Sequence, residues 1–134
     1  MKRPSVRLSL EMRRIVLEAV VQGLMDQGIQ VVVASMDDHH LHALARVRDH
    51  DPRRHMAIAK HYATKCAKAH RLAVGLGMKL GEGIWGKRSK AVPVRDRAHQ
   101  LQIVRYILEH ETRGAVTWFC AKTHRCAVGL RGGL

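Results

Sequence analysis

Four side chains of this sequence have types and spacings that could do chemistry together. His40 and His42 lie two residues apart in an expected strand, where alternate side chains share a face, so both imidazoles could reach one cation. Tyr106 and His110 lie four residues apart on an expected helix, where such neighbours stand about 5–6 Å apart. Packing of that helix beside the strand would create a metal site next to a phenol. The ion would polarise a phosphate oxygen, and the phenol would act as a nucleophile.

The same residues also allow interpretations without catalysis. In a chain with ten histidines, His40 and His42 could be partly exposed strand residues, and Tyr106 could serve only in packing. A further hypothesis is a metal sensor in which His39 joins His40, His42 and His110. The spacing of the residues is compatible with each of these hypotheses.

The charge of the chain indicates a polyanionic partner. Lys and Arg number 24 against 11 Asp and Glu, which gives a net charge of +13. Nucleic acid is the first candidate partner and an anionic membrane surface is the second. Aromatic residues make up only 4%, which argues against base stacking as the main binding device. The basic residues that we expect to contact DNA are Arg46, Arg48, Arg53, Arg54, Lys87, Arg88, Lys90 and Arg105. The remaining histidines, including His55, are expected at the surface without a role.

Other features exclude whole classes of protein. No apolar run approaches the roughly 18 residues of a membrane-spanning helix, so we expect no membrane span. The N-terminus is charged and has no apolar core of the kind that signal peptides contain. The three cysteines are odd in number and widely spaced, which favours a reducing cytoplasm over a disulfide framework.

The first half of the chain is expected to form a helix followed by a hairpin. Apolar residues at helical spacing predict a helix over 9–27, with Ser9 as its N-cap and Gly28 at its end. The apolar run 29–35 predicts a strand buried on both faces. A turn then leads to a second strand over 39–47.

The second half is expected to add two helices and a weak strand. Pro52 suits the start of a helix that runs to about Arg71, with Asp51 as its cap. A weak strand is predicted within 84–94, and a helix over 97–110 follows. The core positions expected on that last helix are Leu101, Val104 and Leu108.

These elements predict one domain over 1–134, with 119–134 as a frayed tail. Paired antiparallel strands and helices indicate an α+β fold with helices packed on one face of the sheet. We expect it to be ferredoxin-like, with the first strand short or missing, because only MKRPSVRL precedes the first helix.

Two segments resemble the signatures of the HUH-type Y1 transposases, and of the REP-associated tyrosine transposases in particular. VVVASMDDHHLHALARV is similar to the strand, turn and strand that carry the family's His-x-His motif. IWGKRSKAVPVRDRAHQLQIVRYILEHETRGAVTW resembles the basic Trp-Gly strand and the helix with a Tyr-Ile motif. The two segments and the helices between them cover residues 10–118.

The resemblance implies a function for the individual residues. His40 and His42 match the metal-binding histidines, Tyr106 matches the nucleophile, and His110 stands where the family has Asn or Gln as a third ligand. Family members cleave and rejoin single-stranded DNA at hairpin or REP-type sites through a 5′-phosphotyrosine and use Mg²⁺ or Mn²⁺. The resemblance therefore implies a transposase-like enzyme that is nucleoid-associated in a bacterial-type cytoplasm, with a homodimer as one allowed state.

The sequence also departs from the family's pattern. Asp37 replaces the usual Pro, His39 precedes the motif, and His110 replaces the amide residue. Together with the short N-terminal segment, these changes imply a shortened member of the family. They also keep open the alternative of a catalytically inactive or domesticated protein that binds DNA or RNA on the same fold.

Overall fold

The fold is an antiparallel sheet with helices on both sides. The computed structural model describes residues 8–37, 40–49, 51–73, 75, 85 and 91–119. In chain order, its elements are α1 (Leu10–Met25), β1 (Gln30–Met36), β2 (Leu41–Arg46), α2 (Pro52–Ala73), α3 (Arg97–Glu109), the 3-10 helix η1 (His110–Arg113) and β3 (Val116–Phe119). The predicted α+β class is confirmed. No helix in the described part of the chain is long and apolar enough to cross a membrane.

The sheet has the strand order β2-β1-β3, with β1 at its centre. The predicted hairpin of β1 and β2 is confirmed, and its register pairs Met36 with Leu41 and Ser35 with His42. β3 pairs with the other edge of β1 in an antiparallel direction. β3 was not predicted, since four residues after a glycine turn give too short a pattern to recognise. Residues 1–7, which would carry the expected first strand, lie outside the described residues.

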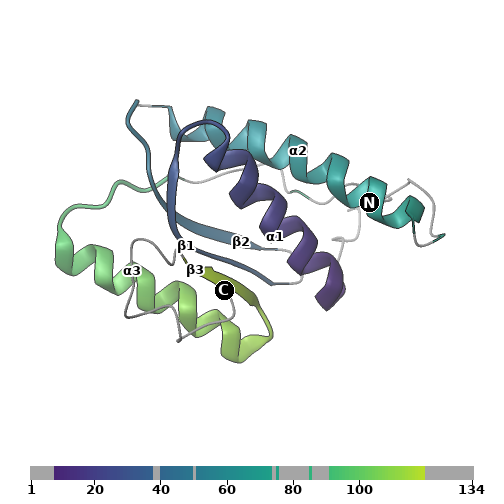
Figure 1. Cartoon of the computed structure of the whole chain (residues 1–134). Coiled ribbons are helices and arrows are strands. Elements are labelled where there is room, and N and C mark those ends of the chain that lie inside the picture. Colours follow the sequence, from purple (N-terminus) through teal and green to yellow (C-terminus); the bar gives the residue numbers. More distant parts are fainter. Residues whose placement is uncertain are drawn as a thin grey trace, which may run out of the picture.

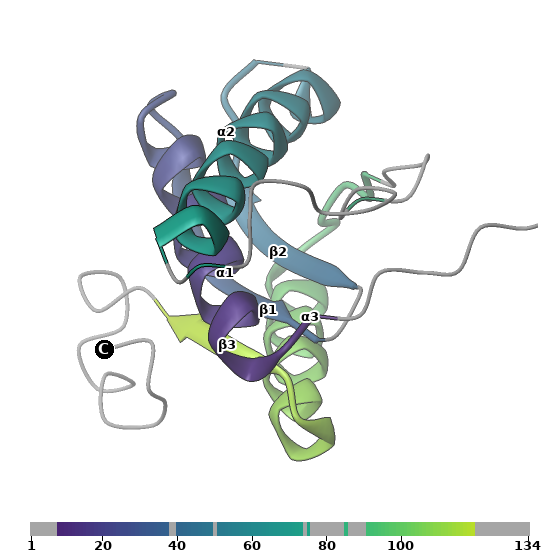
Figure 2. The same cartoon turned by 90° about the vertical axis from the view of Figure 1, so that its right-hand side faces the viewer.

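The helices cover both faces of the sheet, so the expectation of helices on one face is wrong. α1 and α2 pack on one face, and α3 packs against β1 and β2 from the other (Figures 1 and 2). The physical reason lies in β1, which is buried on both sides. Val31, Ala34 and Met36 join the core under α1, and Val32 and Val33 join the core under α3. Two apolar faces need two covering layers.

The predicted helix starts are confirmed by their caps. The Ser9 hydroxyl accepts a hydrogen bond from the Met12 N–H at 3.2 Å. The Asp51 carboxylate accepts from the Arg54 N–H at 3.3 Å, and Asp96 accepts from the His99 N–H at 2.8 Å. These side chains satisfy backbone donors of the first helical turn, which have no partner within the helix.

Two of the three core positions predicted on α3, Val104 and Leu108, pack against the core, whereas Leu101 does not. Leu101 is 47% exposed, whereas Ile107 is buried and Ile103, Val104 and Leu108 pack around it. The apolar residues of this helix are compatible with a buried face that includes either Leu101 or Ile107. Contact with Val33 and Leu44 on the sheet selects the stripe through Ile107. This rotation of the helix also decides where Tyr106 points.

Two predictions concern segments that the structure describes only in part. Trp85 and residues 91–94 lie outside any strand, and the remainder of the weak strand predicted within 84–94 lies outside the described residues. Phe119 does not belong to a frayed tail, because it ends β3 and is only 3% exposed. Residues 120–134 are not described.

α1 and α2 approach each other closely because small residues face each other. Ala59, Ala63 and Ala67 form the buried row of α2. A Cβ atom placed on Gly23 of α1 would lie 3.0 Å from the Cα of Ala59. The backbones of the two helices therefore meet where Gly23 has no side chain.

Gly23→Ala is expected to destabilise the fold by about 1–3 kcal/mol, because the added methyl group pushes α1 away from α2. This cost should exceed the helix-propensity gain of at most about 1 kcal/mol. Urea unfolding measures the difference. As a control, Glu18→Ala on the exposed side of the same helix should change stability by less than about 0.5 kcal/mol. A Gly23→Ala protein as stable as the wild type would contradict the close contact.

Candidate active site

The fold brings three of the four singled-out side chains into contact. His42 projects from β2 toward the face that α3 covers, as Leu44 does two residues later. Tyr106 lies in the last turn of α3, and His110 begins η1 directly after it. The ring centroids of His42 and His110 are 4.6 Å apart, and those of Tyr106 and His110 are 4.7 Å apart. The rings of His42 and Tyr106 meet edge-on at 5.6 Å.

The rings of this cluster differ in exposure, and they therefore differ in the chemistry that each can do. Tyr106 is 54% exposed, so its phenol can be reached from solvent, whereas His110 is only 7% exposed. The Nδ1–H of His110 donates to the backbone carbonyl of Tyr106 at 2.8 Å. That bond orients the ring and leaves the lone pair on Nε2, the nitrogen available for a proton or a metal.

His40 lies at the edge of this cluster. Its ring centroid is 6.4 Å from that of His42, and its side chain is 60% exposed. Asp37 holds His40 at the turn. The Asp37 carboxylate accepts a hydrogen bond from the His40 N–H and lies 3.6 Å from its ring Nδ1. Asp37 thus stabilises the end of the hairpin just before β2 begins.

The environment of His42 favours its neutral form. Burial of the ring lowers the pKa of His42 below its ordinary value, and the nearby imidazoles of His110 and His40 lower it further, while Asp37 opposes them. His42 is therefore neutral at pH 7 and can accept a proton or donate a lone pair to an ion.

The chemical types of the donor atoms in this cluster suit a divalent ion, but their present positions do not. Three imidazoles and a carboxylate lie close together; imidazole nitrogen suits Zn²⁺, whereas Mn²⁺ and Mg²⁺ prefer oxygen ligands such as the carboxylate. Among the described residues, however, no group of three or more His, Cys, Asp or Glu side chains is placed to hold a metal ion. An ion shared by His40, His42 and His110 would require at least one ring to move. His39 lies outside the described residues.

The basic residues predicted to contact DNA do not form one patch. Arg105 is exposed on α3 beside Tyr106 and, with Arg95, lines a shallow hollow of about 480 Å³. Arg46 and Arg48 lie at the far end of β2, and Arg53 and Arg54 begin α2. The structure does not describe Lys87, Arg88 and Lys90.

A second cationic surface follows α2, which lies on the face of the sheet opposite α3 (Figure 2). This helix of 22 residues contains no acidic residue. At 100° per residue, all of its Lys and Arg side chains fall within an arc of about 140°, whose centre lies well away from the row of buried alanines. They are Arg53, Arg54, Lys60, Lys65, Lys68 and Arg71. Because α2 and the histidine cluster lie on opposite faces of the sheet, this surface faces away from the cluster.

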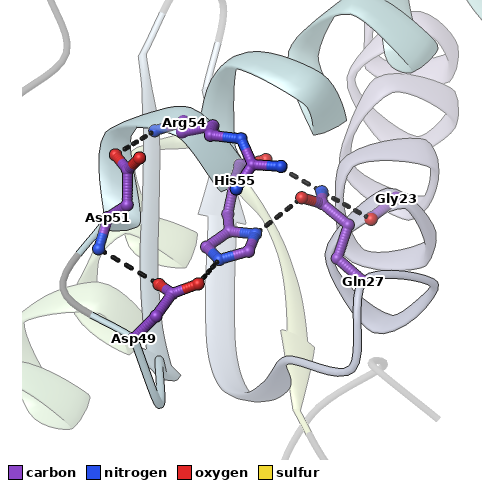
Figure 3. Close-up of polar contacts among 6 residues, drawn as sticks. All are labelled: Gly23, Gln27, Asp49, Asp51, Arg54 and His55. Carbon is purple, nitrogen blue, oxygen red and sulfur yellow. Dashed lines mark hydrogen bonds and ion pairs between the residues drawn. The ribbon is translucent and has the colours of Figure 1, made fainter.

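His55 is the clearest error among the sequence expectations, because it is buried rather than at the surface. Its Nδ1 lies 2.7 Å from Gln27 Oε1, and its Nε2 lies 2.7 Å from Asp49 Oδ2 (Figure 3). The Gln27 amide also donates to the carbonyls of Gly23 and His55. The hydrogen bond with His55 lowers the pKa of Asp49. The signal missed was the row His55, Ala59, Ala63 and Ala67, which shares one helix face at a spacing of four.

His55→Ala is expected to destabilise the protein by about 1–3 kcal/mol, since Gln27 and Asp49 would each lose the hydrogen-bond partner that the His55 ring provides. The stabilisation that comes from the hydrogen bond between His55 and Asp49 is present above the ordinary carboxyl pKa of 3.8. It is lost as the pH falls through the lowered pKa of Asp49. Urea unfolding at pH 7 checks the loss. His61→Ala, at an exposed site of the same helix, is the control and should leave stability within about 0.5 kcal/mol. Equal stability of both variants would show that the network contributes nothing.

Comparisons with known proteins found no match. The chain matched no protein-family model and no curated protein, and its structure matched no solved structure.

Proposed function

We propose that this protein cleaves and rejoins single-stranded DNA, with Tyr106 as the nucleophile. The observation that carries the proposal is the meeting of the Tyr106, His42 and His110 rings within 5.6 Å, although His42 lies far from the other two in the sequence. An exposed phenol next to the neutral imidazole of His42 on a strongly cationic protein suits attack on a phosphodiester. On this proposal, the chain belongs to the HUH-type Y1 transposases and has a ferredoxin-like fold.

The proposed reaction exchanges one phosphoester bond for another. The Tyr106 oxygen bonds to phosphorus while the bond from phosphorus to the O3′ of the preceding nucleotide breaks. The phenol proton passes to a water molecule, and the cationic surroundings favour the phenolate. The leaving O3′ takes up a proton and becomes a 3′-hydroxyl, and the downstream strand stays attached to Tyr106 as a 5′-phosphotyrosine.

Rejoining is the reverse reaction with a different 3′-hydroxyl. That hydroxyl attacks the phosphotyrosine and loses its proton to water, the bond from phosphorus to the Tyr106 oxygen breaks, and the released phenolate takes up a proton. Because one ester replaces another at each step, no separate energy source is needed. The outcome would be transposition or recombination of DNA in a bacterial-type cytoplasm.

His40, His42 and His110 are the residues that would hold a divalent ion, and we propose Mg²⁺ or Mn²⁺. Such an ion would offset the charge that develops on the phosphate oxygens. Asp37 holds His40 beside the hairpin turn and the Tyr106 carbonyl orients the His110 ring, and at least one of the three rings would have to turn before they could share an ion. Arg105 and Arg95, along the outer side of α3, would bind phosphates of the strand near Tyr106.

A denaturing gel tests the proposal. The full chain is incubated with a single-stranded hairpin oligonucleotide and Mn²⁺, with the label at the 3′ end in one sample and at the 5′ end in another. We expect an SDS-resistant protein adduct only on the 3′-labelled strand, and a shorter free product from the 5′-labelled strand. Absence of any adduct over a range of hairpin sequences and ions would contradict the proposal.

A second candidate function is nucleic-acid binding without cleavage, favoured by the cationic surface of α2. A helix of about 33 Å without an acidic residue can follow a phosphate backbone over roughly one turn of a duplex. On this hypothesis, the Tyr106 cluster would have no chemical role.

The joint variant Lys65→Ala, Lys68→Ala is expected to weaken DNA binding at all sequences and to lower the slope of log affinity against log salt by about 1.4–1.8, that is, about 0.7–0.9 for each lost phosphate contact. Fluorescence anisotropy at several salt concentrations gives the slope. Arg14→Ala, an exposed site on α1 outside this surface, is the matched control and should leave the slope unchanged. Equal slopes for all three proteins would contradict a role of α2 in binding.

A further inference from the structure

Ser35 places a polar group where the fold gives it no partner. It lies in the central strand β1 and is only 1% exposed. Its Oγ atom is buried without any hydrogen-bond partner in the described part of the chain. A buried hydroxyl in this condition is destabilising compared with alanine. The position therefore needs an explanation beyond packing.

The strand register puts this hydroxyl beneath the candidate active site. Ser35 pairs with His42 on β2 and with Thr117 on β3, so the three form one row across the sheet. The neighbouring row of Val33, Leu44 and Phe119 contacts α3. Side chains alternate between faces, but positions two residues apart share a face, so the Ser35 row also faces α3. It lies where α3 ends and η1 begins.

The other polar groups near this row already have partners. The Thr117 hydroxyl donates to the Glu111 carboxylate at 2.6 Å, and the His110 Nδ1–H donates to the Tyr106 carbonyl. Directly paired residues of antiparallel strands hold their Cβ atoms about 4.5–5.5 Å apart. The pairing of Ser35 with His42 therefore allows a hydrogen bond between the hydroxyl and the ring in a suitable pair of rotamers.

We propose that Ser35 is a positioning residue for His42, with its Oγ accepting the imidazole N–H from the buried side. The hydrogen bond would select one tautomer and turn the lone pair of the other ring nitrogen toward Tyr106, whose ring lies edge-on at 5.6 Å. The inference rests on the proposed function for its purpose. Its physical content, a single tautomer of His42, holds or fails without DNA.

The test is the imidazole spectrum of the full chain labelled with ¹⁵N and recorded at pH 8, where His42 is neutral. In the wild type, we expect one His42 tautomer to exceed the other about tenfold. In Ser35→Ala, the ratio should fall to that of the exposed His61 ring in the same spectrum. Thr117→Val removes another hydroxyl from the same row and is the matched control, which should leave the His42 ratio unchanged. An unchanged His42 ratio in Ser35→Ala would overturn the inference.

The tautomer ratio and cleavage separate this role from a merely structural one. Ser35→Ala removes the proposed acceptor of the His42 N–H and Thr117→Val removes the hydroxyl that donates to Glu111, so both variants should be less stable than the wild type, and only Ser35→Ala should change the His42 tautomer ratio. If the protein forms the Tyr106 adduct, Ser35→Ala should slow its formation about tenfold with DNA affinity unchanged. If the wild type forms no adduct, the proposed function fails, and the tautomer ratio still decides the role of Ser35.

Discussion

Tyr106→Phe is expected to abolish covalent attachment to DNA, lowering adduct formation by at least about 10⁴-fold, because the phenol oxygen is the atom that bonds to phosphorus. The ring itself stays, so its edge-on contacts with His42 and His110 should persist. DNA affinity should remain within about twofold of the wild type. The SDS-resistant band on 3′-labelled hairpin DNA measures the first effect, and anisotropy measures the second.

The chain offers a matched control for this variant, since it contains two tyrosines. Tyr62 lies on α2, is also exposed at 41%, and is on the other side of the sheet from the cluster. Tyr62→Phe should leave the adduct unchanged. Persistence of the adduct in Tyr106→Phe would show that another group is the nucleophile.

His40→Ala combined with His42→Ala is expected to lower cleavage by about 10²–10⁴-fold and to remove its dependence on Mn²⁺. The pair supplies two of the three imidazoles that would hold an ion. Rates of adduct formation with and without chelator measure both effects. DNA binding should change little, because the expected phosphate contacts are Arg and Lys side chains rather than these rings.

His61→Ala combined with His99→Ala is the control for the number of histidines removed, since His61 and His99 lie outside the cluster. Its rate should equal that of the wild type. Cleavage by the His40 and His42 double variant that stays fast and responds to Mn²⁺ would remove both histidines from the mechanism.

Local signals were sufficient to predict the helix caps and the hairpin. Each cap side chain accepts a hydrogen bond from a backbone N–H three residues later, so a short stretch of sequence is enough to predict it. The caps are Ser9, Asp51 and Asp96. The alternation of side chains along β2 also placed His42 and Leu44 on one face. The convergence of Tyr106 with the histidines followed from these faces once α3 was assumed to lie beside β2.

The errors came from choices that depend on distant parts of the chain. The apolar residues on both faces of β1 already implied a covering layer on each face. No local feature of the sequence, however, shows which face α3 covers. The rotation of α3 that buries Ile107 and exposes Leu101 is decided by contact with Val33 and Leu44. His55 was misplaced because its partners Gln27 and Asp49 come from other elements. Ser35 became visible only through the register of three strands.

The most direct test of the central claim is mass spectrometry of the protein after reaction with hairpin DNA. The adduct is digested with nuclease and trypsin, and the peptide that contains Tyr106 is sequenced. The account predicts a nucleotide joined through its 5′-phosphate to the Tyr106 side chain. A nucleotide on any other residue, or unmodified Tyr106 in a sample whose DNA has been cut, would contradict it.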